Sequence, residues 1–468
     1  MAFNSLTFAF FLPVVFAVYW QLQGHLRWQN AFVVLASYVF YGWLDWRFLG
    51  LIVFSSLLTW GTGLLIANAL RTQNNKLAKL WFIGTITINL GILCIFKYYD
   101  FFVSSLCTLL QIDATKHLLH LVLPVGISFY TFQGISYSVD VYRRNILPTN
   151  NLLTFCAFLT FFPQLVAGPI ERATNLLPQF DSPRRFHYQE AVEGLRRILW
   201  GLFKKVVIAD TCATFINPVW DTYSHQPASA LILAALLFSI QIYGDFSGYS
   251  DIAIGTARLF GIKLRENFRT PYFSRDVAEF WQRWHISLNT WFVDYVYIPL
   301  GGSRNGKART ISNTFVVFLL SGLWHGAEWS FVGWGVYHAL LFMILLITNR
   351  THRYRNEVAT YTQIPQIVLT FILLTMGWIL FRAPDIETAW EFVYSMCNST
   401  IFSIPQGIHF TRLVCLLMCI FAMVFFEWRN RTKNEAPIPH SFIVYYVIVF
   451  AIWWFSGRAS SDFIYFQF

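Results

Sequence analysis

Residues 321–342 read SGLWHGAEWSFVGWGVYHALLF, and the apolar run that they begin extends to residue 348. A helix crosses a bilayer with about 20 mostly apolar residues, which residues 328–348 supply. The whole chain shares this character, because 56% of its 468 residues are hydrophobic, 19% are aromatic and only 12% are charged. Soluble domains carry about 25% charged residues. This composition argues against a soluble enzyme, a disordered chain or a secreted disulfide scaffold, and it predicts an all-α membrane protein with many spans.

Ten stretches are apolar enough to be candidate spans: 3–22, 30–48, 50–70, 80–97, 119–141, 228–249, 328–348, 364–382, 411–427 and 440–456. Others are apolar but are broken by charges, Gly or Pro, and they predict short, tilted or re-entrant helices: 151–169, 192–217, 252–262, 276–300 and 311–325. Irregular backbone at membrane depth persists only where protein or a wet cavity shields it. We therefore predict one membrane domain over 1–468, with the functional interior in the interrupted middle, at about 120–345.

The net charge of +10 comes from scattered cations, without the long basic run that would suggest nucleic-acid binding. Cationic loops of membrane proteins lie on the cytoplasmic side. Placing loops 71–79, 350–355 and 429–433 there puts both the N-terminus and the tail, 457–468, outside. The seven cysteines include no Cys-x-x-Cys pair, so we expect neither a disulfide framework nor a zinc site.

Two histidines lie where ionisable groups are costly, so each needs a reason. His325 is either a residue that hydrogen-bonds neighbouring helices or a general base, since imidazole accepts a proton near neutral pH. Burial would keep such a ring neutral. His285 is either a solvated residue on an Arg-rich face or a second catalytic group. No third residue completes a metal-ligand spacing, so we expect no metal.

The region from Asn267 to Arg309 is rich in cations. They are either topology signals or a phosphate site, for which the planar guanidinium is well suited. The candidates for binding phosphate are Arg269, Arg275, Arg283 and Arg304. We expect Asp245 and Asp251 to pair with arginines of this region rather than to act in catalysis.

Small residues interrupt the apolar segment Leu123–Arg144, which predicts close helix packing. At the other end of the chain, the last residues read FIYFQF. By composition alone this ending is an interfacial aromatic anchor.

Together these motifs resemble the membrane-bound O-acyltransferases, specifically the bacterial branch that serves alginate and peptidoglycan O-acetylation, with teichoic-acid D-alanyl transfer more distant. The resemblance covers nearly the whole chain. It is carried by FNSLTFAFFLPVVFAVYW, LPVGISFYTFQGISYSVDVYR, FFPQLVAGPIER, YGDFSGYSDIAIG, NFRTPYFSRDVAEFWQRWHISLNTWFVDYVYIPLGGSR, GLWHGAEWSFVGWG and FIYFQF. It implies about eleven spans plus re-entrant helices around a central funnel or tunnel.

The resemblance also implies roles for particular residues. His325 matches the family's catalytic histidine in Trp-His-Gly, and His285 matches the second polar position in Trp-x-x-Trp-His. Tyr465 resembles an acyl-carrying tyrosine in the aromatic tail of the teichoic-acid system. The implied donor is cytoplasmic acetyl-CoA, and the implied partner is a periplasmic SGNH-type O-acetyltransferase that modifies a cell-surface glycan.

The implied location is the bacterial inner membrane, with the C-terminus in the periplasm. We favour peptidoglycan as the final acceptor, with alginate or another exopolysaccharide as the alternative. A multi-span transporter is the main competing class, although we see no inverted repeat. A polysaccharide polymerase or flippase would need carboxylate-rich sites or a large polar domain, and neither is evident.

Overall fold

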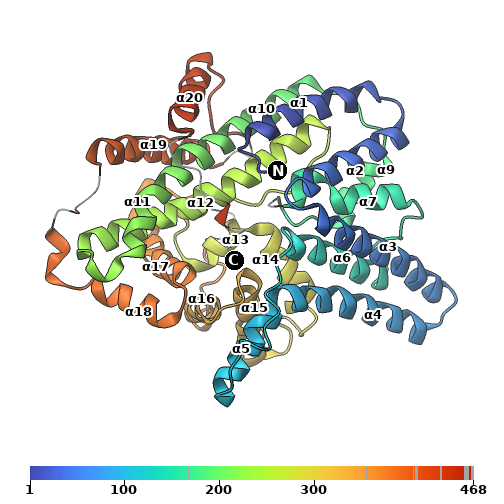
Figure 1. Cartoon of the computed structure of the whole chain (residues 1–468), viewed down its shortest axis with the longest axis horizontal. Coiled ribbons are helices and arrows are strands. Elements are labelled where there is room, and N and C mark those ends of the chain that lie inside the picture. The colour runs from blue at the N-terminus through green and yellow to red at the C-terminus, as the bar shows by residue number, and fades with distance from the viewer. Residues whose placement is uncertain are drawn as a thin grey trace. The chain divides into compact units, whose positions relative to one another are not determined.

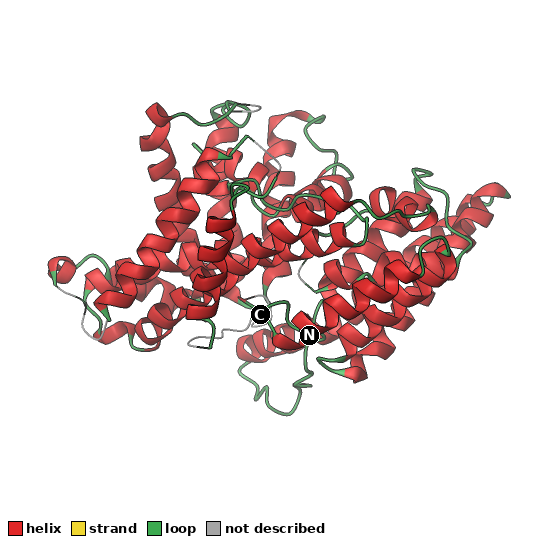
Figure 2. Ribbon diagram, turned by 90° about the horizontal axis from the view of Figure 1, so that it is seen from above, coloured by secondary structure: helices red, strands yellow, loops and turns green. Residues whose placement is uncertain are grey.

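The structure is a computed structural model, and it describes residues 1–166, 168–354, 357–403, 405, 409–432, 435–457 and 463–464. This described part is helical and contains no strand (Figure 2). Six of its helical segments are long and apolar enough to cross a membrane: Trp46–Arg71, Asn75–Leu110, Ala228–Leu259, Trp329–Ile347, Tyr361–Arg382 and Phe410–Arg429. Leu6–Gln21 and Phe442–Phe455 are shorter apolar helices. The predicted all-α, multi-span class is confirmed.

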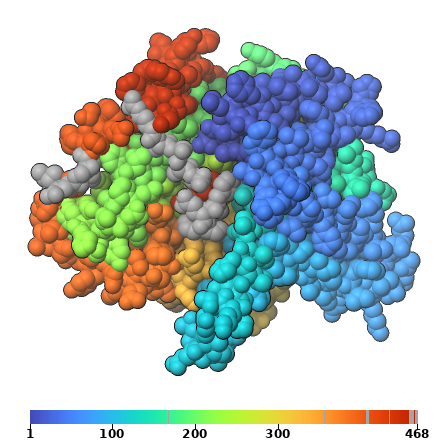
Figure 3. All heavy atoms as spheres, in the orientation of Figure 1, coloured from blue at the N-terminus to red at the C-terminus, as the bar shows by residue number. Residues whose placement is uncertain are grey.

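The chain forms two compact units, of which unit 1 comprises residues 1–195 and 253–265. Its helices are α1 Leu6–Gln21, α2 Leu26–Gly42, α3 Leu49–Arg71, α4 Asn75–Leu93, α5 Tyr99–Leu110, α6 Ile127–Tyr142, α7 Leu152–Thr160, α8 Phe162–Leu165 and α9 Ala173–Asp181 (Figure 1). Short turns of helix lie at Trp46–Phe48 and Cys94–Tyr98. Helix α5 projects from the rest of this unit (Figure 3) and exposes apolar side chains such as Leu106 and Leu109, as expected for a surface that faces lipid.

Helix α6 is the buried centre of unit 1, and it packs against both α3 and α4. A Cβ atom on Gly134 would lie 3.1 Å from the Thr59 hydroxyl, and one on Gly63 would lie 2.7 Å from the Tyr137 ring. Small residues therefore let α3 and α6 approach closely, which is the packing role that the sequence predicted.

The start of α6 differs from the predicted span at 119–141, because the helix begins only at Ile127. Two residues stop it from extending backwards. Pro124 disfavours a helical conformation at the residue before it. Gly126, the residue that precedes the helix, has a positive φ of 76°, which favours glycine.

Unit 2 comprises residues 196–252 and 266–468, so α10 and α12 have residues in both units. Its helices are α10 Tyr188–Leu202, α11 Asp210–Asp221, α12 Ala228–Leu259, α13 Val277–Arg283, α14 Ile286–Phe292, α15 Gly306–His325, α16 Trp329–Ile347, α17 Ile364–Arg382, α18 Ile386–Ser395, α19 Phe410–Arg429 and α20 Phe442–Phe455. Short 3₁₀ or π-helical turns lie at Phe203–Ala209, Tyr223–His225, Pro271–Phe273, Val293–Tyr297, Tyr361–Gln363 and Ser399–Phe402.

Two close helix contacts shape unit 2. Helices α15 and α16 lie side by side (Figure 1), and a Cβ atom on Gly322 would lie 2.3 Å from the carbonyl oxygen of Phe331. Helices α10 and α12 meet at Gly201 and Gly248, where a Cβ atom on Gly248 would lie 2.8 Å from the Gly201 carbonyl oxygen. These contacts fix the end of α15 and the polar stretch of α12, and both carry candidate site residues.

Candidate active site

His325 is the last residue of α15, and its ring is packed among aromatic side chains. The residue is 3% exposed. Its ring centroid lies 5.1 Å from that of Trp324, 5.0 Å from that of Trp334 and 5.3 Å from that of Phe381. Gly326 ends the helix, where a Cβ atom would lie 2.0 Å from the Phe331 ring. The Trp-His-Gly sequence thus places this imidazole at the end of a helix, where aromatic side chains surround it.

His285 occupies the break between α13 and α14, where its backbone has φ 44° and ψ 51°. A non-glycine residue in this left-handed region is uncommon, and such strain often accompanies functional sites. The residue is 1% exposed. Its ring lies 4.6 Å from that of Phe246 and 5.7 Å from that of Trp324. Trp324 therefore contacts both candidate histidines, and the solvated alternative for His285 is wrong.

The side chain of Asn267 fixes which nitrogen of His285 carries the proton. The Asn267 Oδ1 atom lies 3.3 Å from the Ser287 backbone nitrogen, and 2.9 Å from the Ser287 hydroxyl. A backbone N–H can only donate, so this amide atom must be the oxygen. His285 Nδ1, which lies 3.1 Å from the same oxygen, must then donate its proton.

This arrangement leaves the His285 Nε2 atom with a lone pair. Nε2 is buried and has no hydrogen-bond partner among the described residues. The ring is also buried, which disfavours the charged imidazolium and favours the neutral form. A neutral imidazole with a fixed tautomer and an open Nε2 can accept a proton from a substrate.

A third histidine, which we did not single out from the sequence, belongs to the same aromatic array. His338 of α16 is fully buried, and its ring lies 4.8 Å from that of Trp334 and 5.1 Å from that of Trp281. Neither of its ring nitrogens has a hydrogen-bond partner among the described residues. The sequence feature that could have identified His338 is its four-residue spacing from Trp334, which places the two residues on one face of the helix.

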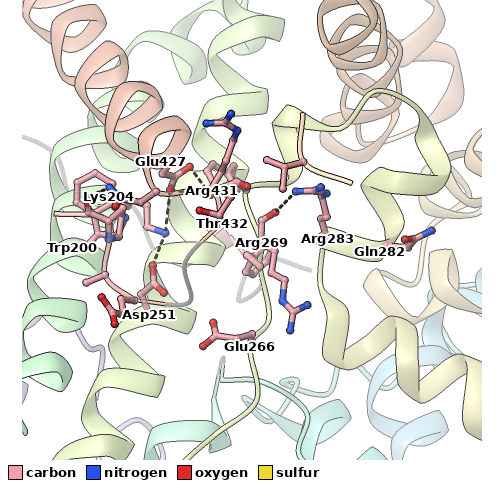
Figure 4. Close-up of a pocket in the computed structure, with 18 of the residues that line it drawn as sticks. Trp200, Lys204, Asp251, Glu266, Arg269, Gln282, Arg283, Glu427, Arg431 and Thr432 are labelled. Carbon is pink, nitrogen blue, oxygen red and sulfur yellow. Dashed lines mark hydrogen bonds and ion pairs between the residues drawn. The ribbon is translucent and has the colours of Figure 1, made fainter. Parts of the chain in front are cut away.

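A polar cavity of about 380 Å³ lies in unit 2 (Figure 4). Arg269 and Arg283 line one side, whereas Lys204, Asp251 and Glu427 line the other. The cavity wall includes neither His285 nor His325. It does include Phe268, whose ring centroid lies 6.4 Å from that of His285. One aromatic ring therefore stands between the cavity and this histidine.

The cavity carries charges of both signs, which the sequence did not reveal. Five cationic residues line it (Arg197, Lys204, Arg269, Arg283 and Arg431) together with six carboxylates (Asp251, Glu266, Glu279, Glu357, Glu427 and Glu435). Most of the cations are neutralised by close ion pairs, such as Lys204 Nζ with Asp251 at 2.6 Å and Arg283 with Glu279 at 2.7 Å. Arg269 is exposed, and no described carboxylate lies within ion-pair distance of it. It is the cation best placed to receive an anionic ligand.

The other two predicted phosphate-binding arginines lie outside this cavity. Arg275 is buried and makes a two-pronged contact with Glu279, with Nε–Oε2 and Nη2–Oε1 distances of 3.0 Å. Arg275 and Glu279 thus form a structural ion pair. Arg304 is exposed in the turn before α15 and is not part of the cavity wall.

The aspartates of α12 do form ion pairs, but their partners are not the predicted ones. Asp251 pairs with Arg197 and Lys204, and Asp245 pairs with Lys205 at 2.8 Å. These cations lie near the α10–α12 contact rather than in the region Asn267–Arg309. The sequence missed them because nothing local links a cation to a carboxylate about 40 residues away.

Two described residues of the C-terminal tail, Phe463 and Ile464, lie inside unit 2. Phe463 and Ile464 are 1% and 2% exposed. The Phe463 ring lies 4.2 Å from that of Tyr249 and 5.8 Å from that of Phe246, which also contacts His285. Interfacial anchoring is therefore wrong for these two residues. Tyr465 lies outside the described residues.

No group of three or more His, Cys, Asp or Glu side chains in the described part of the chain could hold a metal ion.

Comparison with known proteins agrees with the motifs. Residues 144–383 match the model of the membrane-bound O-acyltransferase family, MBOAT. The chain is 40% identical to the probable alginate O-acetylase AlgI of Pseudomonas aeruginosa over 85% of this chain and 75% of the relative. It is 35% identical to the peptidoglycan O-acetyltransferase of Helicobacter pylori, over 85% and 80%. A teichoic acid D-alanyltransferase of Bacillus subtilis is 29% identical over 55% and 68%. This chain belongs to the membrane-bound O-acyltransferase family.

Proposed function

We propose that this protein is the membrane subunit of a cell-surface O-acetylation system. It takes an acetyl group from cytoplasmic acetyl-CoA and passes it, through Tyr465, to a periplasmic SGNH-type O-acetyltransferase. Its expected location is the bacterial inner membrane, with the C-terminus in the periplasm. The observation that carries the proposal is a line of ring contacts: Phe463 contacts Phe246, Phe246 contacts His285, and both His285 and His325 contact Trp324.

The donor is proposed to bind at the charged cavity. Tyr354 and Arg431 line it, and they belong to two of the loops that the positive-inside rule assigns to the cytoplasm. Arg269 would hold a phosphate of the donor by charge-assisted hydrogen bonds, with Arg283 beside it. The thioester would then approach the histidines past Phe268.

The proposed reaction consists of two acyl transfers. His325, oriented or assisted by His285, removes the phenolic proton of Tyr465 as the phenol oxygen attacks the thioester carbonyl, since a phenol with a pKa near 10 needs a base at neutral pH. The carbon–sulfur bond breaks, and the coenzyme A thiolate takes the proton from the imidazolium. The partner then transfers the acetyl group from the aryl ester to a glycan hydroxyl, whose proton returns to Tyr465.

The direct test uses membranes that contain the full chain and acetyl-CoA with a radiolabelled acetyl group. We expect label on the native protein and none on Tyr465→Phe. His325→Ala should lower the labelling rate by about 10²–10⁴-fold. Near-native labelling of a folded His325→Ala protein would exclude the base assignment, and labelled export from Tyr465→Phe would exclude the relay. A transporter would give neither label nor acetyl-CoA turnover.

Peptidoglycan is the proposed final acceptor. A second candidate is alginate or another exopolysaccharide, because the P. aeruginosa alginate relative reaches 40% identity. Mass spectrometry of ester groups on both polymers, before and after deletion of the gene, separates the two. Loss of acetyl groups from the exopolysaccharide alone would exclude peptidoglycan.

A further inference from the structure

Ile464 of the C-terminal tail meets a buried charge cluster that includes Asp245 of α12. The Ile464 backbone N–H donates to Asp245 Oδ2 at 2.8 Å, across 219 residues of sequence. Asp245 is 1% exposed and Ile464 is 2% exposed, so this hydrogen bond is shielded from solvent. A charge-assisted hydrogen bond in such surroundings is about twice as strong as a neutral one.

A lysine between two carboxylates holds Asp245 in place. Lys205 Nζ lies 2.8 Å from Asp245 Oδ1 and 2.8 Å from Asp210 Oδ1, and its side chain is fully buried. Lys205 thus takes up one oxygen of Asp245 and leaves Oδ2 directed at the tail. The ammonium group carries one positive charge against two carboxylates, so a further donor such as the Ile464 N–H helps to satisfy the cluster.

Aromatic contacts set the position of the tail beside this hydrogen bond. Phe463 packs on Tyr249, which is four residues after Asp245 on the same face of α12. Phe246, the residue after Asp245, contacts both Phe463 and His285. One turn of α12 therefore binds the tail backbone, accommodates its aromatic side chain and touches a candidate catalytic histidine.

We propose that Asp245, oriented by Lys205 and Asp210, is the anchor that holds the C-terminal tail inside the protein by its backbone, so that the tail is a tethered acceptor rather than a free extension. Asp245 is a positioning residue, since it acts through the Ile464 amide. The inference rests on the proposed function for the meaning of the tail. The anchoring itself depends only on the contacts above.

The test measures exposure of the tail and needs no acyl transfer. Ile464→Cys is placed in the full chain, in a background where the exposed Cys94 and Cys397 are serine. The rate of modification by a maleimide is then compared with and without a change at Asp245. We expect Asp245→Ala to speed modification by at least about tenfold, and Asp245→Asn, which keeps a neutral acceptor oxygen, by about threefold.

The matched control is Asp251→Asn. Asp251 lies on the same helix and pairs with Arg197 and Lys204, but it makes no contact with Phe463 or Ile464, the described residues of the motif at the end of the tail. Its substitution should leave the modification rate within about twofold. An equal increase for Asp251→Asn and Asp245→Asn would overturn the proposal, because general loosening would then explain both. If Asp245→Ala fails to fold, an unchanged rate in a folded Asp245→Asn protein overturns it as well.

Kinetics separate this inference from the proposed function. In the Asp245 variants the rate of tail acetylation should fall while the KM for acetyl-CoA stays constant, because the donor site is untouched. Faster cysteine modification combined with persistent export from Tyr465→Phe would retain the anchor and exclude the relay. Unchanged, slow cysteine modification in the Asp245 variants, combined with a requirement for Tyr465 in export, would exclude the anchor and retain the relay.

Discussion

The Nδ1 atom of His285 lies 3.1 Å from the Oδ1 atom of Asn267, and this contact decides which nitrogen of the His285 ring carries the proton. Because the same oxygen accepts the Ser287 N–H, the imidazole must donate from Nδ1 and keep a lone pair on Nε2. An amide 18 residues earlier in the chain thereby prepares the histidine to accept a proton.

Without the side-chain amide of Asn267, the His285 ring should no longer be held in the tautomer that carries its proton on Nδ1. We expect Asn267→Ala to lower the acetyl-transfer rate by about 10–100-fold, because the ring can then rotate or carry its proton on Nε2. Ser287→Ala removes only the hydroxyl that also donates to Asn267 and should cost less than about threefold. Single-turnover transfer from acetyl-CoA measures both rates. Similar rates for Asn267→Ala and native protein would refute the orienting role.

Arg269, an exposed cation of the cavity without a described carboxylate partner, should govern donor affinity. Arg269→Gln is expected to raise the KM for acetyl-CoA by about tenfold with little change in kcat, because one charge-assisted contact to phosphate is lost. Arg304→Gln, at an exposed arginine outside the cavity, is the control and should leave KM unchanged. Steady-state kinetics at fixed ionic strength compare them. An equal effect of both substitutions would point to general electrostatic attraction instead of a site.

For His338, we expect substitution to preserve or improve the stability of the protein rather than to impair its function. Both of its ring nitrogens are buried without a described partner, and an unsatisfied buried polar group costs about 1–3 kcal/mol. His338→Leu should therefore raise the thermal stability of the protein in detergent, or leave it unchanged, and keep the transfer rate within about threefold. A large loss of activity in a protein with native stability would instead assign His338 to the catalytic machinery beside His325.

The α10–α12 contact should tolerate no side chain. A Cβ atom on Gly248 would lie 2.8 Å from the Gly201 carbonyl oxygen, so Gly248→Ala is expected to destabilise the protein by about 1–3 kcal/mol. Gly84→Ala is the control, because a Cβ atom there meets nothing within 4 Å and alanine favours the helix. Thermal unfolding in detergent compares the two. A Gly248→Ala protein as stable as native would show that these helices can separate at little cost.

Much of the fold and part of the site could be predicted from the sequence. Apolar runs such as 328–348 identify spans because transfer into a bilayer depends on the composition of each segment. The family resemblance implied roles for His325 and His285, because the Trp-His-Gly and Trp-x-x-Trp-His motifs that carry it each lie within a few residues. The predicted boundary at 119–141 was wrong, since Pro124 and Gly126 act locally against a helix.

Sequence alone thus determined the membrane class, the all-α fold and the family resemblance, and it proposed the two motif histidines as candidates, since all of these follow from local composition or local motifs. Only the tertiary structure decided which cations stay free of carboxylates, which nitrogen of His285 holds the proton, and where Phe463 and Ile464 lie. These features depend on contacts between distant segments, such as Ile464 with Asp245. Pairing of buried polar groups is settled by packing in three dimensions, and no local pattern of residues encodes it.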